Sequence, residues 1–121
     1  MKLRKDPRVV VMERSNALHV TLPEQVNLVT IDAGWTKQRL ILPNALRLLR
    51  PGGLIVSLVK PHYECADKER KGGLVQPQFI EEILLRVEQE AFAGLTVLGK
   101  TESPIKGEKG GNREFLYFLA P

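Results

Sequence analysis

The order in which strand-like and helix-like segments alternate restricts the fold of this chain more than any other feature of its sequence. Short runs rich in apolar and β-branched residues lie at 8–13, 26–32, 54–60, 95–102 and 114–120. Apolar residues at helical spacing occupy 36–49 and 77–93, so a helix is expected on either side of the third run. Strands that alternate with helices pair mostly in parallel, whereas the last two runs, with no helix between them, must pair antiparallel or lie apart. We therefore predict an α/β layered fold.

Proline and glycine positions set the expected boundaries of these helices. Pro43 lacks an N–H and clashes with the preceding turn, so it is expected to kink the first helix or to mark its true start. The sequence "RPGG" (50–53) is expected to stop that helix, with a glycine in the left-handed cap conformation. Pro77 is suitably placed to open the second helix. The segments 61–75 and 103–112 are expected to be loops.

Length, composition and charge narrow the class of protein. A length of 121 residues favours one domain, and 43% hydrophobic with 26% charged residues argue against global disorder. The single Cys65 excludes an internal disulfide, and His19 and His62 lack the spacing of metal ligands, so no metal is expected. No apolar run approaches the roughly 20 residues that span a bilayer, so we expect a cytoplasmic protein with no membrane partner. The net charge of +4 is compatible with a polyanionic partner without requiring one.

Three charged residues fall at the ends of predicted strands. The stretch "LVKPHYE" (58–64) is an apolar strand that ends on Lys60, and Asp32 ends the strand before it. Because the carboxyl ends of parallel strands lie at the same edge of a sheet, these two side chains are expected to be close together. Glu114 begins the last strand, and its start lies at the same edge if that strand is antiparallel. The sequence therefore predicts an acid–lysine–acid cluster.

Such a cluster has a chemical use and a structural alternative. A lysine held between carboxylates can, when it is partly desolvated, have a lowered pKa and accept a proton from a hydroxyl nucleophile. In the structural alternative, Asp32 caps a helix, Lys60 is solvated, and Glu114 pairs with Arg113 or Lys109. The residues alone leave both interpretations open.

Three stretches of the chain resemble a known family. They are "VNLVTIDAGWTKQRLILPNALRLLRPGGLIVSLVKPHYE", "KGGLV" and "SPIKGEKGGNREFL", and they resemble the hemolysin A/TlyA-type branch of the FtsJ-like methyltransferases. Family members are S-adenosylmethionine-dependent ribosomal RNA 2′-O-ribose methyltransferases built on a Rossmann-like sheet. The resemblance runs from about Lys2 to the end. It implies that residues 1–121 form a single partial domain of this type, with a mostly parallel sheet, an antiparallel C-terminal strand and helices on both faces.

The resemblance also implies roles for individual residues. The family uses a Lys–Asp–Lys–Glu tetrad, and Asp32, Lys60 and Glu114 match its last three members, with Lys60 as the base on the ribose 2′-hydroxyl. Asn16 and Ala17, together with Asp32, match the region that faces the cofactor adenine, although a turn asparagine can also be purely structural. Independently of the resemblance, the positive charges of Arg70, Lys71, Lys106, Lys109 and Arg113 make these residues candidate contacts to an RNA backbone.

The chain departs from the family pattern in two ways. The first tetrad lysine and the glycine-rich cofactor loop would lie upstream of anything in this sequence, and no G-x-G-x-x-G stretch follows a strand here. The sequence "DAGW" (32–35) stands where the family usually has Asp-Val-Ser-Phe. Trp35 is therefore a candidate for stacking on a base or adenine, or alternatively a core residue beside a helix start.

These departures leave three functional interpretations. The chain is a methyltransferase that is inactive alone, a non-catalytic RNA-binding module, or an interaction subunit that completes a split enzyme. In the family sheet, the strand equivalent to 26–32 has a neighbour that this sequence does not supply, and exposed strand edges invite pairing. We expect that strand 8–13 covers this edge, or that the protein forms a homodimer or binds a partner that supplies the missing half.

Overall fold

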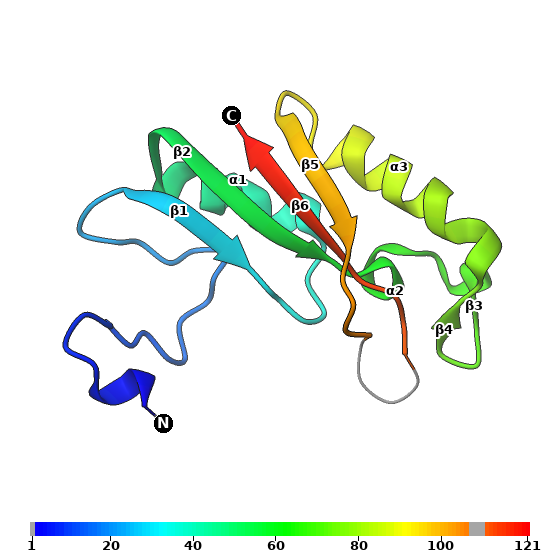
Figure 1. The fold of residues 1–121 in the computed structure, drawn as a ribbon, viewed down its shortest axis with the longest axis horizontal. Helices are drawn as coiled ribbons and strands as arrows, with labels where there is room; N and C mark the ends of the chain where they lie inside the picture. Colours follow the sequence, from blue (N-terminus) through cyan, green and yellow to red (C-terminus); the bar gives the residue numbers. More distant parts are fainter. Residues whose placement is uncertain (1, 107–110) are drawn as a thin grey trace.

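A four-stranded sheet organises the protein, whose computed structural model describes residues 2–106 and 111–121 (Figure 1). Its strands are β1 (Val26–Ile31), β2 (Leu49–Val59), β5 (Thr96–Glu102) and β6 (Phe115–Ala120), and their order across the sheet is β1-β2-β6-β5. Strands β1 and β2 are parallel, and β6 is antiparallel to both β2 and β5. Only the C-terminal strand therefore runs against the others, which confirms the predicted α/β class and its antiparallel last strand.

Two eleven-residue helices connect the strands. Helix α1 (Gln38–Leu48) joins β1 to β2, and α3 (Ile80–Glu90) lies between β2 and β5 in the chain. The shorter elements are α2 (Pro61–Glu64), the 3-10 turns Leu3–Lys5, Asp67–Glu69 and Pro77–Phe79, and the hairpin of β3 (Arg70–Lys71) and β4 (Leu74–Val75). Among the described residues, no helix is both long and apolar enough to cross a membrane.

The hydrophobic core lies between the sheet and these helices. Along β6, Phe115, Tyr117 and Leu119 are buried while the residues between them are not, which is the period-two pattern of a strand with one covered face. Tyr117 packs edge-on against Phe92, just beyond α3, with the ring centroids 5.0 Å apart. The buried residues that the helices contribute include Ile41, Leu42 and Ala45 of α1 and Ile83, Leu84 and Val87 of α3.

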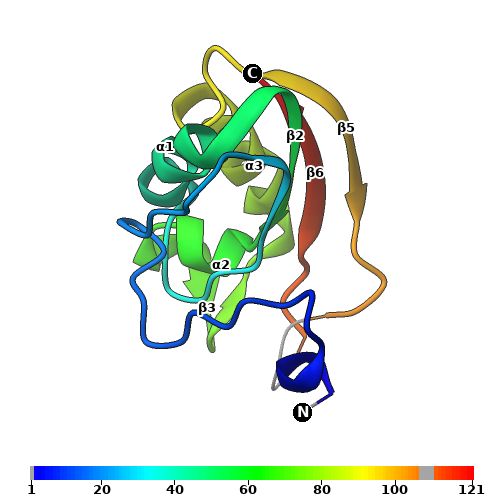
Figure 2. The ribbon, with the colours of Figure 1, turned by 90° about the vertical axis from the view of Figure 1, so that its left-hand side faces the viewer.

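The opposite face of the sheet carries apolar side chains without a cover. Leu28 of β1 is 54% exposed and Phe118 of β6 is 46% exposed, and both lie on this face. Figure 2 shows α1, α2 and α3 together on the other side. The helical layers implied for both faces are therefore reduced to one in the described part of the chain. Both crossovers advance in the same direction across the sheet, and right-handed crossovers of one direction place their helices on one face.

The predicted strand at 8–13 is wrong. Residues 8–13 form no strand, their side chains are exposed, and β1 is left as an edge strand. The segment that follows is held by α1 instead, because the Asn44 side-chain amide donates to the Ala17 and Val20 carbonyl oxygens at 2.7 and 3.2 Å. Arg47 donates to the Val20 carbonyl as well, at 2.6 Å. These bonds hold residues 17–20 against the helix.

The turn between α1 and β2 also differs from the prediction. Helix α1 begins at Gln38 and contains Pro43 in its interior, so the proline does not mark the start. The "RPGG" residues belong to β2, where the pairing jumps from Val26–Leu49 to Leu28–Leu54, and Gly52 adopts a φ of +81° there. The glycine that was expected to cap a helix thus allows a bulge in a strand.

The segment 61–75 is more ordered than the loop that the sequence predicts. It contains the single-turn helix α2, a 3-10 turn and the β3–β4 hairpin, whose tip is formed by Gly72 and Gly73 at positive φ. Two adjacent positive φ angles are the requirement of a tight hairpin turn of this type, which glycine meets without strain. Elements of two to four residues are too short to show a periodicity in sequence.

Candidate active site at the carboxyl edge of the sheet

Asp32 and Lys60 are ion-paired at the edge where β1 and β2 end. Asp32 follows the last residue of β1 and Lys60 follows the last residue of β2, and the ammonium nitrogen lies 2.7 Å from the carboxylate. The Lys60 side chain is 15% exposed, whereas that of Asp32 is 70% exposed. The parallel pairing of the two strands therefore brings together the residues that the sequence predicted to meet, with the lysine as the more buried partner.

Glu114 lies beside this pair on the adjacent antiparallel strand. The last registered pair between β2 and β6 is Val59–Phe115, and the next position on each strand is Lys60 and Glu114. Lys60 and Glu114 lie just outside the two strands, Lys60 immediately before α2 and Glu114 immediately before β6. The negative charge of Glu114 acts on the Lys60 ammonium. The three residues therefore form one cluster at the edge of the sheet where β1 and β2 end and β6 begins.

The surroundings of Lys60 act on its pKa in opposite directions. Burial of the ammonium group lowers the pKa, but the hydrogen bond to Asp32 and the negative charges of Asp32 and Glu114 together raise it above the ordinary lysine value. In this arrangement Lys60 holds its proton at neutral pH. A further positive charge, or a segment that buries the cluster more deeply, would lower the pKa toward the range of a base.

Two aromatic rings stand next to the cluster. Trp35 follows Asp32 by three residues, is 89% exposed and has a positive φ of 60°, which is rare for a residue other than glycine. Its ring lies 4.9 Å from that of Tyr63, and the Lys60 ammonium lies 5.5 Å from the Tyr63 ring centre. The alternative that Trp35 belongs to the core is wrong. Sequence reasoning missed Tyr63, whose only signal was its place within "LVKPHYE".

Of the three residues predicted to face the cofactor, two line a cavity and the third makes a local turn contact. Ala17 and Asp32 both line a mostly apolar cavity of about 290 Å³ between β1, α1 and the segment 17–20. Asn16 instead accepts a hydrogen bond from the Leu18 backbone N–H at 2.9 Å, which is the structural role of a turn asparagine. The other residues that line this cavity are mostly apolar side chains of β1 and α1.

The predicted RNA-contacting residues gather only in part. Lys71, Lys106 and Arg113 line a second cavity, of about 510 Å³, beside the β3–β4 hairpin. Both guanidinium contacts of Arg113 go to Glu102, at 2.7 and 2.8 Å, so its charge is compensated. Lys109 lies outside the described residues. Lys71 and Lys106 are therefore the cations of this cavity best suited to a phosphate.

Arg70 and Asn112 hold the hairpin in place. The Arg70 guanidinium donates to the His62 carbonyl at 2.9 Å and so connects β3 to α2. Asn112 accepts from the Val75 backbone N–H at 3.0 Å and donates to the Gly73 carbonyl at 3.1 Å, as an additional strand residue would. Arg70 thus has a structural contact where an RNA contact was expected, and Asn112 is a site-shaping residue that the sequence reasoning did not single out.

Comparison with known proteins gives one consistent result. The model of the FtsJ-like methyltransferase family matches residues 1–120. YqxC of Bacillus subtilis, a candidate rRNA methyltransferase, is 39% identical over 98% of this chain and 44% of its own length. The 16S/23S rRNA (cytidine-2′-O)-methyltransferase TlyA of Mycobacterium tuberculosis is 36% identical over 95% of this chain and 45% of its own length. This chain therefore spans less than half the length of these relatives.

A solved structure shows the same arrangement of elements. A candidate hemolysin from Streptococcus thermophilus superposes on this chain with a TM-score of 0.88 at 35% identity. The match covers 98% of this chain and 45% of that one. The fold described here is therefore one part of a larger structure in that protein.

Proposed function

This chain belongs to the FtsJ-like methyltransferase family, and on that premise we propose that its Asp32, Lys60 and Glu114 cluster serves the 2′-O-methylation of ribose in RNA. The proposed substrate class is ribosomal RNA, and the proposed methyl donor is S-adenosylmethionine. The observation that carries the proposal is the 2.7 Å pair of Lys60 with Asp32, with the charge of Glu114 beside it. The geometry is that of a lysine aimed by two carboxylates at one edge of the sheet.

Each residue of the cluster has a distinct part in this chemistry. S-adenosylmethionine would supply an electrophilic methyl group. Lys60 hydrogen-bonds the ribose 2′-hydroxyl, orients its oxygen, and takes its proton once the pKa of the amine has been lowered. Asp32 fixes the amine in place at 2.7 Å, and Glu114 acts on the same amine by its charge. Ala17 and Asp32 would hold the adenine end of the cofactor in the cavity beside α1.

The RNA would approach from the side of the exposed aromatic and basic residues. Trp35 offers a free ring face to a nucleobase, and its ring already stacks on Tyr63 next to Lys60. Lys71 and Lys106 lie where they would neutralise backbone phosphates. Stacking near the lysine with charge farther out would place a ribose over the cluster.

We further propose that activity needs a covering segment outside residues 1–121, supplied as the missing half of the relatives or by a second copy of this chain. The raised pKa of Lys60 and the uncovered apolar face of the sheet both favour this proposal, since a segment that covers the sheet and its carboxyl edge would bury the amine further. The cover would come from a segment equivalent to the rest of the relatives, or from a second copy of this chain. A non-catalytic role in RNA binding is the alternative, favoured by the basic cavity beside the hairpin.

A methyl-transfer assay tests the proposal. The chain is mixed with the segment of YqxC that it does not match, radiolabelled S-adenosylmethionine and ribosomal RNA, and label in the 2′-O position is measured. Lys60→Ala is expected to abolish the transfer. The control is Lys100→Ala, which replaces a lysine of β5 that pairs with Glu88 of α3 and is expected to preserve the transfer. Equal activity of Lys60→Ala and the unchanged protein would refute the assigned role. Salt-sensitive RNA binding without cofactor binding or transfer would instead establish the RNA-binding alternative.

A further inference from the structure

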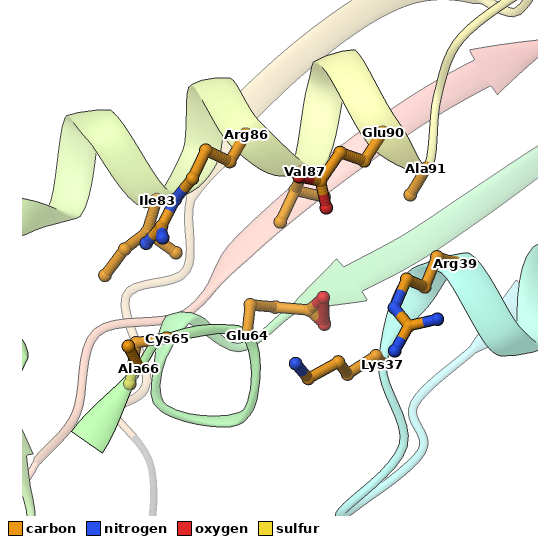
Figure 3. A pocket seen from close by; sticks show the side chains of 10 residues that line it. All are labelled: Lys37, Arg39, Glu64, Cys65, Ala66, Ile83, Arg86, Val87, Glu90 and Ala91. Carbon is orange, nitrogen blue, oxygen red and sulfur yellow. The ribbon is translucent and has the colours of Figure 1, made fainter.

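Glu64 is a partly buried carboxylate that the proposed chemistry does not use. It ends the "LVKPHYE" stretch and lies at the last position of α2, four residues after Lys60. Figure 3 shows its side chain directed into a cavity of about 250 Å³ between α1, α2 and α3. Burial raises the pKa of Glu64, while the Gln38 N–H and the nearby Lys37 and Arg39 lower it, with a net increase. A carboxylate that is costly to bury calls for a reason at this position.

The Glu64 carboxylate caps a helix that belongs to another part of the chain. Its two oxygens accept the backbone N–H of Gln38, the first residue of α1, at 3.1 and 3.4 Å. Helices leave their first N–H groups without internal partners, and a side chain at the N-cap usually supplies one. The α1 N-cap is Lys37, whose side chain makes no such bond. Glu64 therefore supplies the cap from 26 residues away in sequence, with a charge that suits the helix N-terminus.

Gln38 extends this connection into the strand that carries Lys60. Its side chain is only 4% exposed, and it accepts from the Ser57 hydroxyl at 2.6 Å. Its amide donates to the Leu58 carbonyl at 3.3 Å. Gln38 therefore contacts the chain on both sides of Lys60, at Leu58 before it and at Glu64 after it.

The same junction holds the other side of the cluster. Residues 32–37 connect Asp32 and Trp35 to α1, and their far end is fixed where Glu64 contacts Gln38. Tyr63, the neighbour of Glu64, stacks on Trp35 and lies near the Lys60 ammonium. The Glu64 carboxylate therefore joins the segment that follows Asp32 to the segment that follows Lys60.

We propose that Glu64 is a positioning residue, which holds α2 against the start of α1 and thereby sets the Lys60–Asp32 pair and the Trp35–Tyr63 stack. Its importance for catalysis rests on the function proposed above for Lys60. The positioning itself is measured without turnover.

Two spectroscopic signals report on this arrangement. Trp35 is the only tryptophan, so its fluorescence reports on the 32–37 loop and its stack on Tyr63. The NMR titration of the Lys60 side chain reports on its pair with Asp32. In Glu64→Ala we expect the emission of Trp35 to change, and the Lys60 pKa to fall as the pair with Asp32 loosens. Glu64→Gln keeps an acceptor oxygen at the same reach, so it is expected to preserve both signals.

Matched variants separate positioning from general stability. Tyr117→Phe removes a hydrogen bond to Glu88 in the core, far along the chain from this junction, and is expected to change neither signal. Glu64→Asp, which is milder if Glu64→Ala fails to fold, shortens the reach and is expected to shift both signals in the direction of Glu64→Ala.

Unchanged signals in a folded Glu64→Ala or Glu64→Asp protein would overturn the proposal, as would a Glu64→Gln protein that behaves like Glu64→Ala. If the signals shift as expected but Lys60→Ala retains methyl transfer, the proposed function fails and the positioning stands.

Discussion

The uncovered face of the sheet gives the sharpest test of how this chain works, because adjacent residues of β6 point to opposite sides. Phe118 lies on the uncovered face at 46% exposure, whereas Leu119 is fully buried against the helices. A phenylalanine contributes about 200 Å² of surface, so roughly 90 Å² of it is left to be buried by whatever covers this face. At about 25 cal/mol per Å², covering it stabilises the association by about 2 kcal/mol, or roughly thirtyfold in affinity.

Phe118→Ala should therefore weaken association with little loss of stability, and Leu119→Ala should do the reverse. The buried leucine leaves a cavity, so its replacement is expected to cost about 2–5 kcal/mol of the free energy of unfolding. Association is measured by calorimetry against the unmatched segment of YqxC and by sedimentation for self-association, and stability is measured by urea unfolding. An unchanged association constant for Phe118→Ala, or no association of the unchanged protein with itself or with that segment, would refute the reasoning.

Three further predictions concern stability, pH and RNA. Gly53→Ala should lower the free energy of unfolding by about 1–3 kcal/mol in urea titrations, because its Cβ would lie 2.9 Å from the Arg50 carbonyl oxygen and 2.5 Å from a methyl of Leu49. Burial, with the charges of Lys60 and Arg70, lowers the pKa of His62 below 6.5, so the unfolded chain binds this proton more readily. The contribution of His62 to the free energy of unfolding is thus fully present above pH 6.5 and is lost as the pH falls through the lower pKa of the folded state. His62→Gln should reduce this loss, measured as the difference between urea titrations at about pH 7.5 and about pH 5.5. For RNA, measured by filter binding over a range of salt, Lys71→Ala should reduce the slope of log affinity against log salt by about 1, whereas Trp35→Ala should weaken binding at an unchanged slope.

The helix-capping contact of Glu64 illustrates what sequence patterns miss. The residues before α1, "GWTK", place a lysine at the N-cap, and nothing in them indicates that a glutamate 26 positions later completes the helix. A contact of this kind depends on where α2 sits relative to α1, which is a property of the packed core. The same holds for Trp35, whose exposure follows from the path of the loop and not from its apolar character.

The wrong strand at 8–13 has a related cause. A β-branched run indicates that a segment can extend, but a strand also needs a partner with free backbone groups within reach. Hydrogen bonds from Asn44 and Arg47 hold residues 17–20 against α1, and the run at 8–13 pairs with no strand. The order of the strands likewise placed both crossover helices on one face of the sheet, whereas the family resemblance had implied helices on both faces.

By itself, the sequence determined the α/β class and the position of Asp32 and Lys60, because apolar runs with the period of a strand end at these residues and parallel strands end at one edge. Only the tertiary structure decided what surrounds them. The reversal of β6 brought Glu114 beside Lys60, and the resulting charges raise the lysine pKa where burial alone would lower it. Local patterns specify elements and their ends, whereas pKa values, caps and exposed faces depend on groups distant in the chain that packing brings within a few ångströms.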